Sequence, residues 1–387
     1  MKIAFIATEI GLQEGGAYMG GTVNNIVTIG RELSERGHDI SLITTTPRDA
    51  AEKPMAELDW ATVYEYDPPF DHGTPWYFAS FCLFAARTSR QLAQSGELDT
   101  ATIHAGYPQW GVIGRLASAV TDCRIIHVQY CPLNQKSGKK LYDVTKHPWF
   151  VRRYLGSADG LVGISENVSN TLNEVCDRSD SHVILPAIDT ERYAPKAASV
   201  SRESEKYISY LGSLNPQKGL DILIDAFDEI RDTHDYKLKL GLEVRSERSD
   251  SELANRIRQD PDIEVNGIVD NVPAFLAGSD LFAIPFRTTM GPADYPVAAL
   301  EAMSCGTPIL ATDVGGLRQL VNNSSGGYCV GDPTVANFES GLQTLLKDVQ
   351  RREEMADNAR EFIIDSCSVS RVTDQFESVL RPELSSS

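Results

Sequence analysis

Short apolar runs alternate with longer amphipathic segments along the chain, and after a polar break the alternation restarts. Strand-like runs in the first half are KIAFIAT, DISLITTT, RIIHVQY and GLVGIS, and those in the second half are KYISYLGSL, YKLKLGLEV, IEVNGIV, LFAIPF and TPILATD. Strands that alternate with helices favour a parallel, doubly wound sheet. The sequence therefore predicts an α/β protein with two Rossmann-like domains that face each other across a cleft, where such folds bind ligands.

The polar break RYAPKAASVSRESEK contains proline and several serines, as interdomain linkers do. A chain of 387 residues is also long enough for two cores. We expect an N-terminal domain at 1–191, a linker at 192–206, a C-terminal domain at 207–365 and a final amphipathic helix at 366–387 that crosses back to the N-terminal domain.

Composition excludes several classes of protein. A net charge of −18 disfavours nucleic acid as a partner, because phosphate backbones require a basic surface. The start MKIAFIATEI lacks a signal-peptide cleavage site and no apolar run has the ~18 residues needed to cross a bilayer, so we expect a cytoplasmic location. The seven cysteines form no close pairs, which argues against a disulfide framework and against a zinc site.

A glycine-rich stretch, Gly15-Gly16-Ala-Tyr-Met-Gly20-Gly21, follows the first predicted strand and precedes a helix. Glycines let the backbone approach a ligand closely, and a helix N-terminus attracts a phosphate. No G-x-G-x-x-G pattern occurs, and the second strand ends in threonines rather than the acidic residue that binds a nicotinamide ribose. A dinucleotide dehydrogenase is therefore disfavoured, and a plain flexible turn remains an alternative.

Two charged residues in the second half point to a ligand. Lys218 precedes the helix that begins near Leu220, and a lysine there opposes the helix dipole unless an anion binds between them. Glu301 lies among apolar neighbours on a helix of about nine residues, which we expect to begin at Pro296, and ribose hydroxyls would satisfy its carboxylate. The alternatives are a solvated turn lysine and a glutamate on a solvent-facing stripe.

Six segments in order resemble the retaining GT-B glycosyltransferases of family four, also called group 1. They cover nearly the whole chain: GGTVNNIVTIGRELSERGHDISLIT, ADGLVGISENV, LPAIDTERYAP, YLGSLNPQKGLDILIDAF, NGIVDNVPAFLAGSDLFAIPF and YPVAALEAMSCGTPILATDVGG. The resemblance implies a GT-B fold and transfer of a sugar from a nucleoside-diphosphate sugar to an acceptor hydroxyl. It also implies no cofactor beyond that co-substrate and no metal ion.

By position, the resemblance assigns the diphosphate to Lys218 and the ribose hydroxyls to Glu301. It places Gly20 and Gly21 against the phosphates from the other domain, and it aims the Val297 amide at the leaving group. As the sugar leaves in the loose transition state, negative charge grows on the diphosphate. These amides, the lysine and the helix dipole would stabilise that charge.

Departures from the family pattern affect both substrates. The first glutamate of the E-x7-E motif falls on Ala293, and we take Asp294 as its substitute. The family often has an arginine that binds phosphate where this chain has Ser213. Arg245 or another basic residue could bind the phosphate in its place.

The family's active-site histidine aligns with Tyr130 in this chain. We take His127, three residues earlier, as the catalytic histidine, while a core histidine within the strand remains an equal alternative. His104 is interpreted as structural.

The motif Asp260-Pro-Asp262 matches the D-x-D of metal-dependent glycosyltransferases of another fold, and we interpret it as a surface turn.

The acceptor is a glycan, a lipid-linked molecule or a small polar compound. Basic and aromatic residues gather at 136–154, and we expect peripheral contact there with an anionic inner membrane face or a phosphate-bearing acceptor, helped by 76–86. A solvated helix face and a buried core helix are the alternatives.

Two competing functions remain at this stage. A sugar-nucleotide epimerase on the same fold would need no acceptor, and a non-catalytic sugar-binding or nucleotide-binding protein would show no turnover.

Overall fold

The computed structural model describes residues 1–8, 12–13, 21–46, 52–53, 58–71, 74–105, 110–133, 147–195, 205–242, 251–289 and 293–381. Its chain divides into two compact units, residues 1–187 with 369–387 and residues 188–368. The division lies near the expected boundaries, but 188–191 belong to the second unit rather than the first. Of the expected linker, the structure describes only 192–195 and 205–206.

Unit 1 contains a seven-stranded sheet in the order β5-β3-β1-β6-β7-β8-β9, and the strand pairs that join it are parallel. Its strands are β1 (Lys2–Ile6), β3 (Asp39–Thr45), β5 (Thr62–Tyr66), β6 (Thr100–Ala105), β7 (Arg124–Gln129), β8 (Gly160–Gly163) and β9 (His182–Val183), beside a small pair, β2 (Leu12–Gln13) and β4 (Glu52–Lys53). Its helices are α1 (Gly21–Glu35), α2 (Pro75–Gln94), α3 (Gly111–Val120), α5 (Pro148–Tyr154), α6 (Glu166–Cys176) and α15 (Val369–Leu380).

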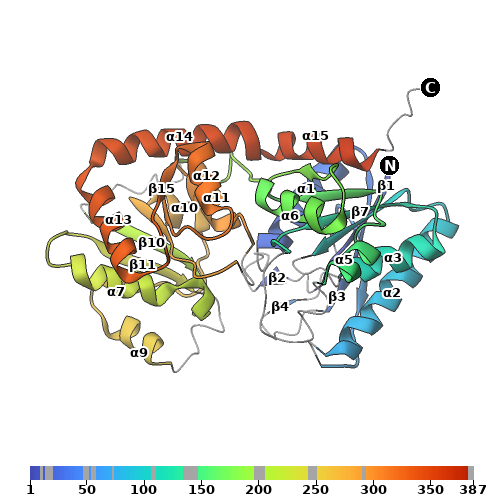
Figure 1. Ribbon diagram of the computed structural model, residues 1–387, viewed down its shortest axis with the longest axis horizontal. Coiled ribbons are helices and arrows are strands. Elements are labelled where there is room, and N and C mark those ends of the chain that lie inside the picture. Colours follow the sequence, from blue (N-terminus) through green and yellow to red (C-terminus); the bar gives the residue numbers. More distant parts are fainter. Residues whose placement is uncertain are drawn as a thin grey trace. The chain divides into compact units, whose positions relative to one another are not determined.

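Helices cover both faces of this sheet (Figure 1). Alternate residues of β6 show which helix covers which face: Ile103 lies against Gly114 of α3, whereas the His104 ring lies beside Phe376 of α15, with 6.2 Å between the ring centres. The α1 helix packs beside α15. The doubly wound arrangement expected from the sequence is therefore present, with a helix from the chain's C-terminal end on one face.

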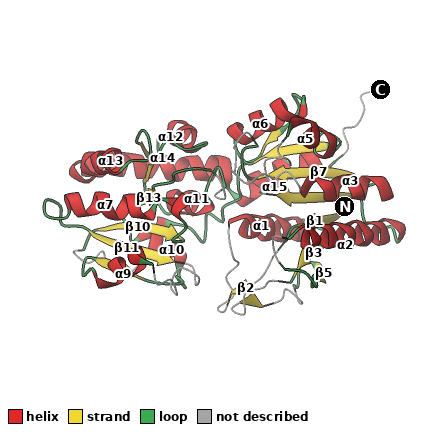
Figure 2. Ribbon diagram, turned by 60° about the horizontal axis from the view of Figure 1, so that its bottom comes forward, coloured by secondary structure: helices red, strands yellow, loops and turns green. Residues whose placement is uncertain are grey.

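Unit 2 contains a parallel six-stranded sheet in the order β12-β11-β10-β13-β14-β15 (Figure 2). Its strands are β10 (Tyr207–Gly212), β11 (Lys237–Leu242), β12 (Ile263–Val265), β13 (Leu281–Ile284), β14 (Ile309–Ala311) and β15 (Gly327–Cys329). Its helices are η3 (Pro216–Lys218), α7 (Leu220–Ile230), α9 (Glu252–Gln259), α10 (Val272–Ala277), α11 (Val297–Ser304), α12 (Leu317–Ser324), α13 (Val335–Lys347) and α14 (Val349–Cys367).

The core of unit 2 follows from the helical spacing of its apolar residues. One face of α7 packs on the sheet beside α13, and buried members of this core are Ile208, Tyr210, Leu223, Phe227, Leu240 and Phe338. All seven cysteines are free thiols. No helix in the described part of the chain combines the length and apolar character of a membrane span.

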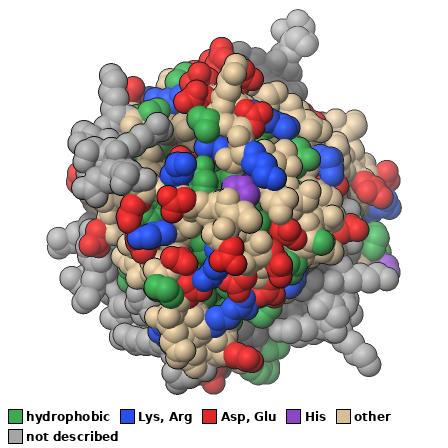
Figure 3. Space-filling view, turned by 90° about the vertical axis from the view of Figure 1, so that its left-hand side faces the viewer, with side chains coloured by type: hydrophobic (Ala, Val, Ile, Leu, Met, Phe, Trp, Pro, Cys, Tyr) green, Lys and Arg blue, Asp and Glu red, His purple; other side chains and the backbone are tan. Residues whose placement is uncertain are grey.

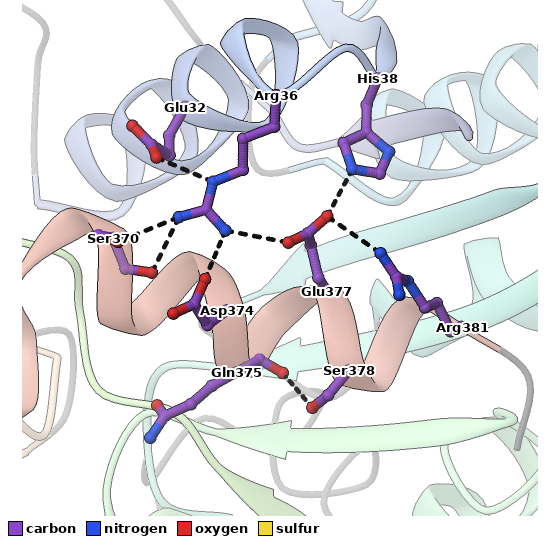
Figure 4. Close-up of polar contacts among 9 residues, drawn as sticks. All are labelled: Glu32, Arg36, His38, Ser370, Asp374, Gln375, Glu377, Ser378 and Arg381. Atoms are coloured by element: carbon purple, nitrogen blue, oxygen red, sulfur yellow. Dashed lines mark hydrogen bonds and ion pairs between the residues drawn. The ribbon is translucent and has the colours of Figure 1, made fainter.

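The α15 helix is held on α1 by a cluster of charged side chains (Figure 4). The Arg36 guanidinium binds Glu32 at 2.9 Å, Asp374 at 2.6 Å and Glu377 at 2.9 Å. Glu377 also accepts a 2.7 Å hydrogen bond from His38. Burial acts to raise the pKa of Glu377, but the bonds from His38 and Arg36 outweigh it and lower that pKa.

We expect Arg36→Ala to lower the free energy of unfolding by about 1–2 kcal/mol, because it removes charged hydrogen bonds from three carboxylates at once. Urea unfolding at pH 7 measures the change. Arg31→Ala is the matched control, since Arg31 is exposed on the same helix. Equal effects of the two substitutions would contradict an anchoring role for Arg36.

Candidate functional site

The order of strands in unit 2 defines a switch point between β10 and β13. From β10 the chain runs through α7 to β11 and β12 on one side, and it then returns to form β13 on the other side of β10. Doubly wound folds bind ligands at the carboxyl ends of two such strands. The segments that leave β10 and β13 here are Ser213–Lys218 and Pro285–Thr289.

These two segments contact each other closely. The Arg287 amide donates a 2.9 Å hydrogen bond to the Gln217 carbonyl. Gly219 has a φ of +66°, and a Cβ atom on it would lie 1.9 Å from the Pro285 carbonyl oxygen. Only glycine fits at this position. Lys218 is therefore held at the N-terminus of α7, which begins at Leu220 as predicted.

Arg287 is a residue that the sequence analysis missed. It lies in the segment that leaves β13, as Lys218 lies in the segment that leaves β10, and its Nη2 pairs with Asp221 Oδ2 at 2.6 Å. Ser213, where the family has arginine, is 5% exposed, and its carbonyl accepts a 2.8 Å bond from the Tyr210 hydroxyl. The switch point thus retains two cations despite the serine. Arg245, the other suggested cation, lies outside the described residues.

Glu301 lies in α11, which begins at Val297 with Pro296 as its N-cap rather than as its first residue. The Glu301 side chain is buried at 5% exposure. Its partner is the Tyr193 hydroxyl: burial raises the pKa of Tyr193, and the charge and hydrogen bond of Glu301 raise it further. Tyr193 was not expected from the sequence to approach this carboxylate, although it directly follows the segment LPAIDTER. Val297, in the first turn, belongs to the part of a helix that offers free amides.

Asp294 precedes α11 in the chain, and its side chain contacts the turn that leads into α12. It is 1% exposed, and its Oδ1 accepts a 3.0 Å hydrogen bond from the Gly316 amide. Cβ atoms on Gly315 or Gly316 would collide with this carboxylate. Beside Gly315, the Thr289 hydroxyl is buried and lacks a hydrogen-bond partner among the described residues. Asp294 therefore shapes a glycine turn that carries a buried, unsatisfied hydroxyl at its edge.

His127 lies inside the sheet of unit 1. It pairs with Ile103 in β6 and so faces the α3 side. It is 1% exposed, its Nε2 lies 3.1 Å from Gln129 Oε1, and burial lowers its pKa to about 4 against an opposing effect of Gln129. A residue so placed does not suit direct contact with a substrate. Of the two interpretations of His127, the geometry favours the core histidine.

A second buried network lies on the opposite face of this sheet. The Asn25 amide donates to the Tyr130 hydroxyl at 3.0 Å, which leaves that hydroxyl to donate to His104 Nδ1, also at 3.0 Å. His104 Nε2 lies 3.2 Å from Thr102 Oγ1. Burial and then the neighbouring His127 lower the pKa of His104 to about 3, so the ring is neutral at pH 7. This geometry is that of a structural histidine.

The glycine loop is only partly described. Gly21 is the first residue of α1, at the N-terminus where a phosphate was expected. Gly20 and the preceding glycines lie outside the described residues, as do 136–146 of the basic segment.

The D-x-D motif is engaged in ion pairs. Asp260 binds Arg231 at 2.6 Å, and Asp262 lies 3.6 Å from the same guanidinium. Within the ranges that the structure describes, no group of three or more histidine, cysteine or acidic side chains could hold a metal ion. These aspartates form part of a surface ion-pair cluster.

Two family models together match almost the entire chain. The model described as Glycosyltransferase Family 4 matches residues 19–192, and the model described as Glycosyl transferases group 1 matches residues 193–362.

Characterised relatives align along most of their length. The chain is 25% identical to the N-acetyl-alpha-D-glucosaminyl L-malate synthase of Bacillus anthracis, covering 91% of each chain. It is 24% identical to the D-inositol 3-phosphate glycosyltransferase of Jonesia denitrificans, covering 90% of this chain and 88% of that one.

Similar solved structures include the sucrose-phosphate synthase of Thermosynechococcus elongatus, with a TM-score of 0.79, 17% identity and 97% coverage of both chains. Another is the Anabaena protein HepE in complex with UDP and glucose, with a TM-score of 0.75, 19% identity and coverage of 98% of this chain and 99% of that one.

Proposed function

Because the chain belongs to the GT-B glycosyltransferases of group 1, we propose that it moves a sugar from a nucleoside-diphosphate sugar to an acceptor hydroxyl, with retention at the anomeric carbon. The observation that carries this proposal is the switch point of unit 2. There the Lys218 loop contacts the segment that leaves β13, and the two strands β10 and β13 lead into α7 and α11.

Each part of this site has a role in the proposed reaction. Lys218, with the N-terminus of α7, binds the diphosphate, and Arg287 supplies the second positive charge that Ser213 lacks. Glu301 accepts hydrogen bonds from the ribose hydroxyls and exchanges the Tyr193 hydroxyl for them when the donor binds. Negative charge grows on the diphosphate as the sugar leaves, and fixed cations and amides stabilise it there.

The reaction as proposed uses no metal ion and no cofactor. Support comes from the two cations, which can neutralise a diphosphate, and from the pairing of Asp260 and Asp262 with Arg231. Asp294 shapes the glycine turn beside the donor sugar, and the role proposed for Gly20 and Gly21 is to bind a phosphate through their backbone amides. His127 positions β7 from inside the sheet.

The names of the relatives suggest an acceptor class. One relative is named for L-malate and another for D-inositol 3-phosphate, and both names denote small anionic compounds with a hydroxyl group. HepE binds UDP and, in another structure, UDP-glucose. We therefore propose that the acceptor is a small anionic compound. Lipid-linked molecules and glycans are the next candidates to be tested.

The first test is the shift in melting temperature with UDP, GDP, ADP and NAD. A ligand at 100 times its Kd stabilises the folded state by about 2.7 kcal/mol. We expect one nucleoside diphosphate to stabilise the protein, and Lys218→Ala and Arg287→Ala to weaken its binding about 10-fold each. Lys347→Ala is the control, because Lys347 is exposed on α13 away from β10 and β13.

Stabilisation by NAD alone would contradict the proposal, as would unchanged diphosphate binding in both variants. A second assay distinguishes the three remaining functions. The protein is incubated with sugar conjugates of the nucleotide that it binds, with and without acceptors. An epimerase converts its nucleotide sugar without an acceptor, a binding protein produces nothing, and a transferase forms product only when an acceptor is present.

A further inference from the structure

Three adjacent helices of unit 1 have a composition unlike the rest of the chain. The α3 helix packs against both α2 and α5, so the three form one layer (Figures 1 and 2). Their 20, 10 and 7 residues include no aspartate or glutamate. They include five arginines: Arg87, Arg90, Arg115, Arg152 and Arg153. The whole chain has 54 acidic and 36 basic residues, so this layer reverses the charge of its surroundings.

On the exposed side of α2, apolar residues come first along the helix and arginines follow them. Trp76 is 69% exposed and Leu83 is 66% exposed, and one and two turns further on the same stripe continues with the exposed residues Arg87 and Arg90. The spacing of three to seven residues places these side chains on one face of the helix. The exposed stripe of α2 is therefore apolar toward the start of the helix and cationic toward its end.

The α5 helix repeats this combination. Trp149 is 68% exposed, and the exposed residues Arg152 and Arg153 follow it within one turn. Arg152 donates to the Val175 carbonyl and lies 3.8 Å from Asp177. We call the exposed residues Trp76, Leu83, Arg87, Arg90, Trp149, Arg152 and Arg153 the arginine–tryptophan face.

The cations of this face differ from the paired arginines on the surface of unit 2. Within the described ranges, Arg87, Arg90 and Arg153 have no ion pair. On unit 2, by contrast, Arg231 and Arg256 each bind two or more aspartates, and Figure 3 shows basic and acidic side chains interspersed over such a surface. Among the described residues, Arg87, Arg90 and Arg153 of the arginine–tryptophan face are thus uncompensated by acidic side chains, and only Arg152 lies near one.

We propose that the arginine–tryptophan face binds the surface of an anionic lipid bilayer. Indole rings favour the membrane–water interface, and unpaired arginines bind lipid phosphates while their stems stay in contact with apolar groups. A protein with a net charge of −18 is repelled by an anionic surface as a whole, so attachment requires a local region without acids. The inference concerns a surface of unit 1 and does not depend on the proposed chemistry of unit 2.

The test is sedimentation of the full chain with vesicles of phosphatidylcholine alone and with vesicles that also contain phosphatidylglycerol. We expect binding to the anionic vesicles, weakened by 0.5 M salt. Charge reversal in Arg87→Glu/Arg90→Glu should lower the partition coefficient about 10-fold or more, and Trp76→Ser/Leu83→Ser should lower it by a similar factor.

The matched control is Val349→Ser/Ile364→Ser, because these two residues are apolar, 54% and 43% exposed, and belong to α14 of unit 2. This variant should bind anionic vesicles like the wild type. Unchanged melting temperatures would show that the substituted surfaces remain folded. Failure of the wild type to sediment with phosphatidylglycerol vesicles would overturn the proposal, as would equal binding by the α2 variants. Neither result would affect nucleotide binding, which is measured separately.

Discussion

Replacement of Glu301 by alanine is expected to lower kcat/KM about 10²–10³-fold. The carboxylate is 5% exposed and, by our proposal, binds both ribose hydroxyls of the donor. Loss of one partner of a buried charged hydrogen bond costs about 2–5 kcal/mol. The substitution also leaves the Tyr193 hydroxyl in a buried site without its acceptor. Steady-state rates with the donor identified by the melting-temperature assay measure the effect.

A 2′-deoxy donor analogue tests whether the ribose is the cause. The wild type should bind the ribonucleoside diphosphate more tightly than the deoxy analogue, and Glu301→Ala should bind the two equally. Tyr193→Phe is the control, because it keeps the ring and removes only the hydroxyl, so it should retain the preference for ribose. Equal discrimination by the wild type and Glu301→Ala would show that Glu301 does not contact the ribose.

Replacement of Lys239 by methionine is expected to stabilise the protein by on the order of 1–2 kcal/mol at pH 7. Lys239 in β11 is 8% exposed, and its ammonium group lies 5.0 Å from the centre of the Tyr207 ring and 4.9 Å from that of Phe275. Burial lowers its pKa from 10.5 to about 8, against the opposing charges of Glu264 and Asp280. That shift corresponds to a cost of about 3 kcal/mol for the charged form. Loss of the cation–π contacts offsets about 1 kcal/mol of the gain, while a thioether packs well against aromatic rings.

The pH dependence of stability also tests whether burial of the Lys239 charge destabilises the folded protein. Below pH 8 Lys239 is charged in both the folded and the unfolded state, so the full cost is present. Between about pH 8 and pH 10.5 the folded state releases the proton first, and the free energy of unfolding of the wild type should rise relative to that of Lys239→Met. Urea unfolding at pH 7, 9 and 10 measures the difference, which should shrink as the pH increases.

Lys237→Met provides the comparison, because Lys237 is on the same strand and face, and its surface ion pair with Glu205 is 2.6 Å long. An exposed ion pair contributes little to stability, so this variant should be neutral or slightly less stable. A destabilised Lys239→Met would mean that the aromatic contacts outweigh the burial of the charge.

Local pattern predicted most of the secondary structure. Alternating apolar residues identified β1, β3, β7, β8 and β10 to β14, because buried parallel strands are rich in β-branched residues. The edge strands β5 and β15 were not predicted, because β5 (TVYEY) has no buried apolar run and β15 has only three residues. The α2 helix was considered as a buried core helix, and the structure shows that one side of it is exposed.

The candidate site was predictable where a single segment determines the position. Lys218 and Glu301 follow strands of the sheet within one turn or one short helix, so sequence alone placed them. Arg287 and Tyr193 reach the same neighbourhoods from segments distant in sequence, and no local pattern marks them. For His127 the sequence prediction and the structure differ. Its chemistry suggested catalysis, but the direction in which a strand residue points depends on the register of the whole sheet.

The assignment of α15 to unit 1 has a consequence for synthesis of the protein. During translation the β1 and β6 strands emerge first, but Phe5 and His104 lack their contacts with Phe376 until α15 leaves the ribosome. All of unit 2, residues 188–368, emerges before that. Domains generally fold in order of synthesis. Here the second unit is synthesised in full before the first, so the N-terminal half of the chain completes its packing only after α15 has been made.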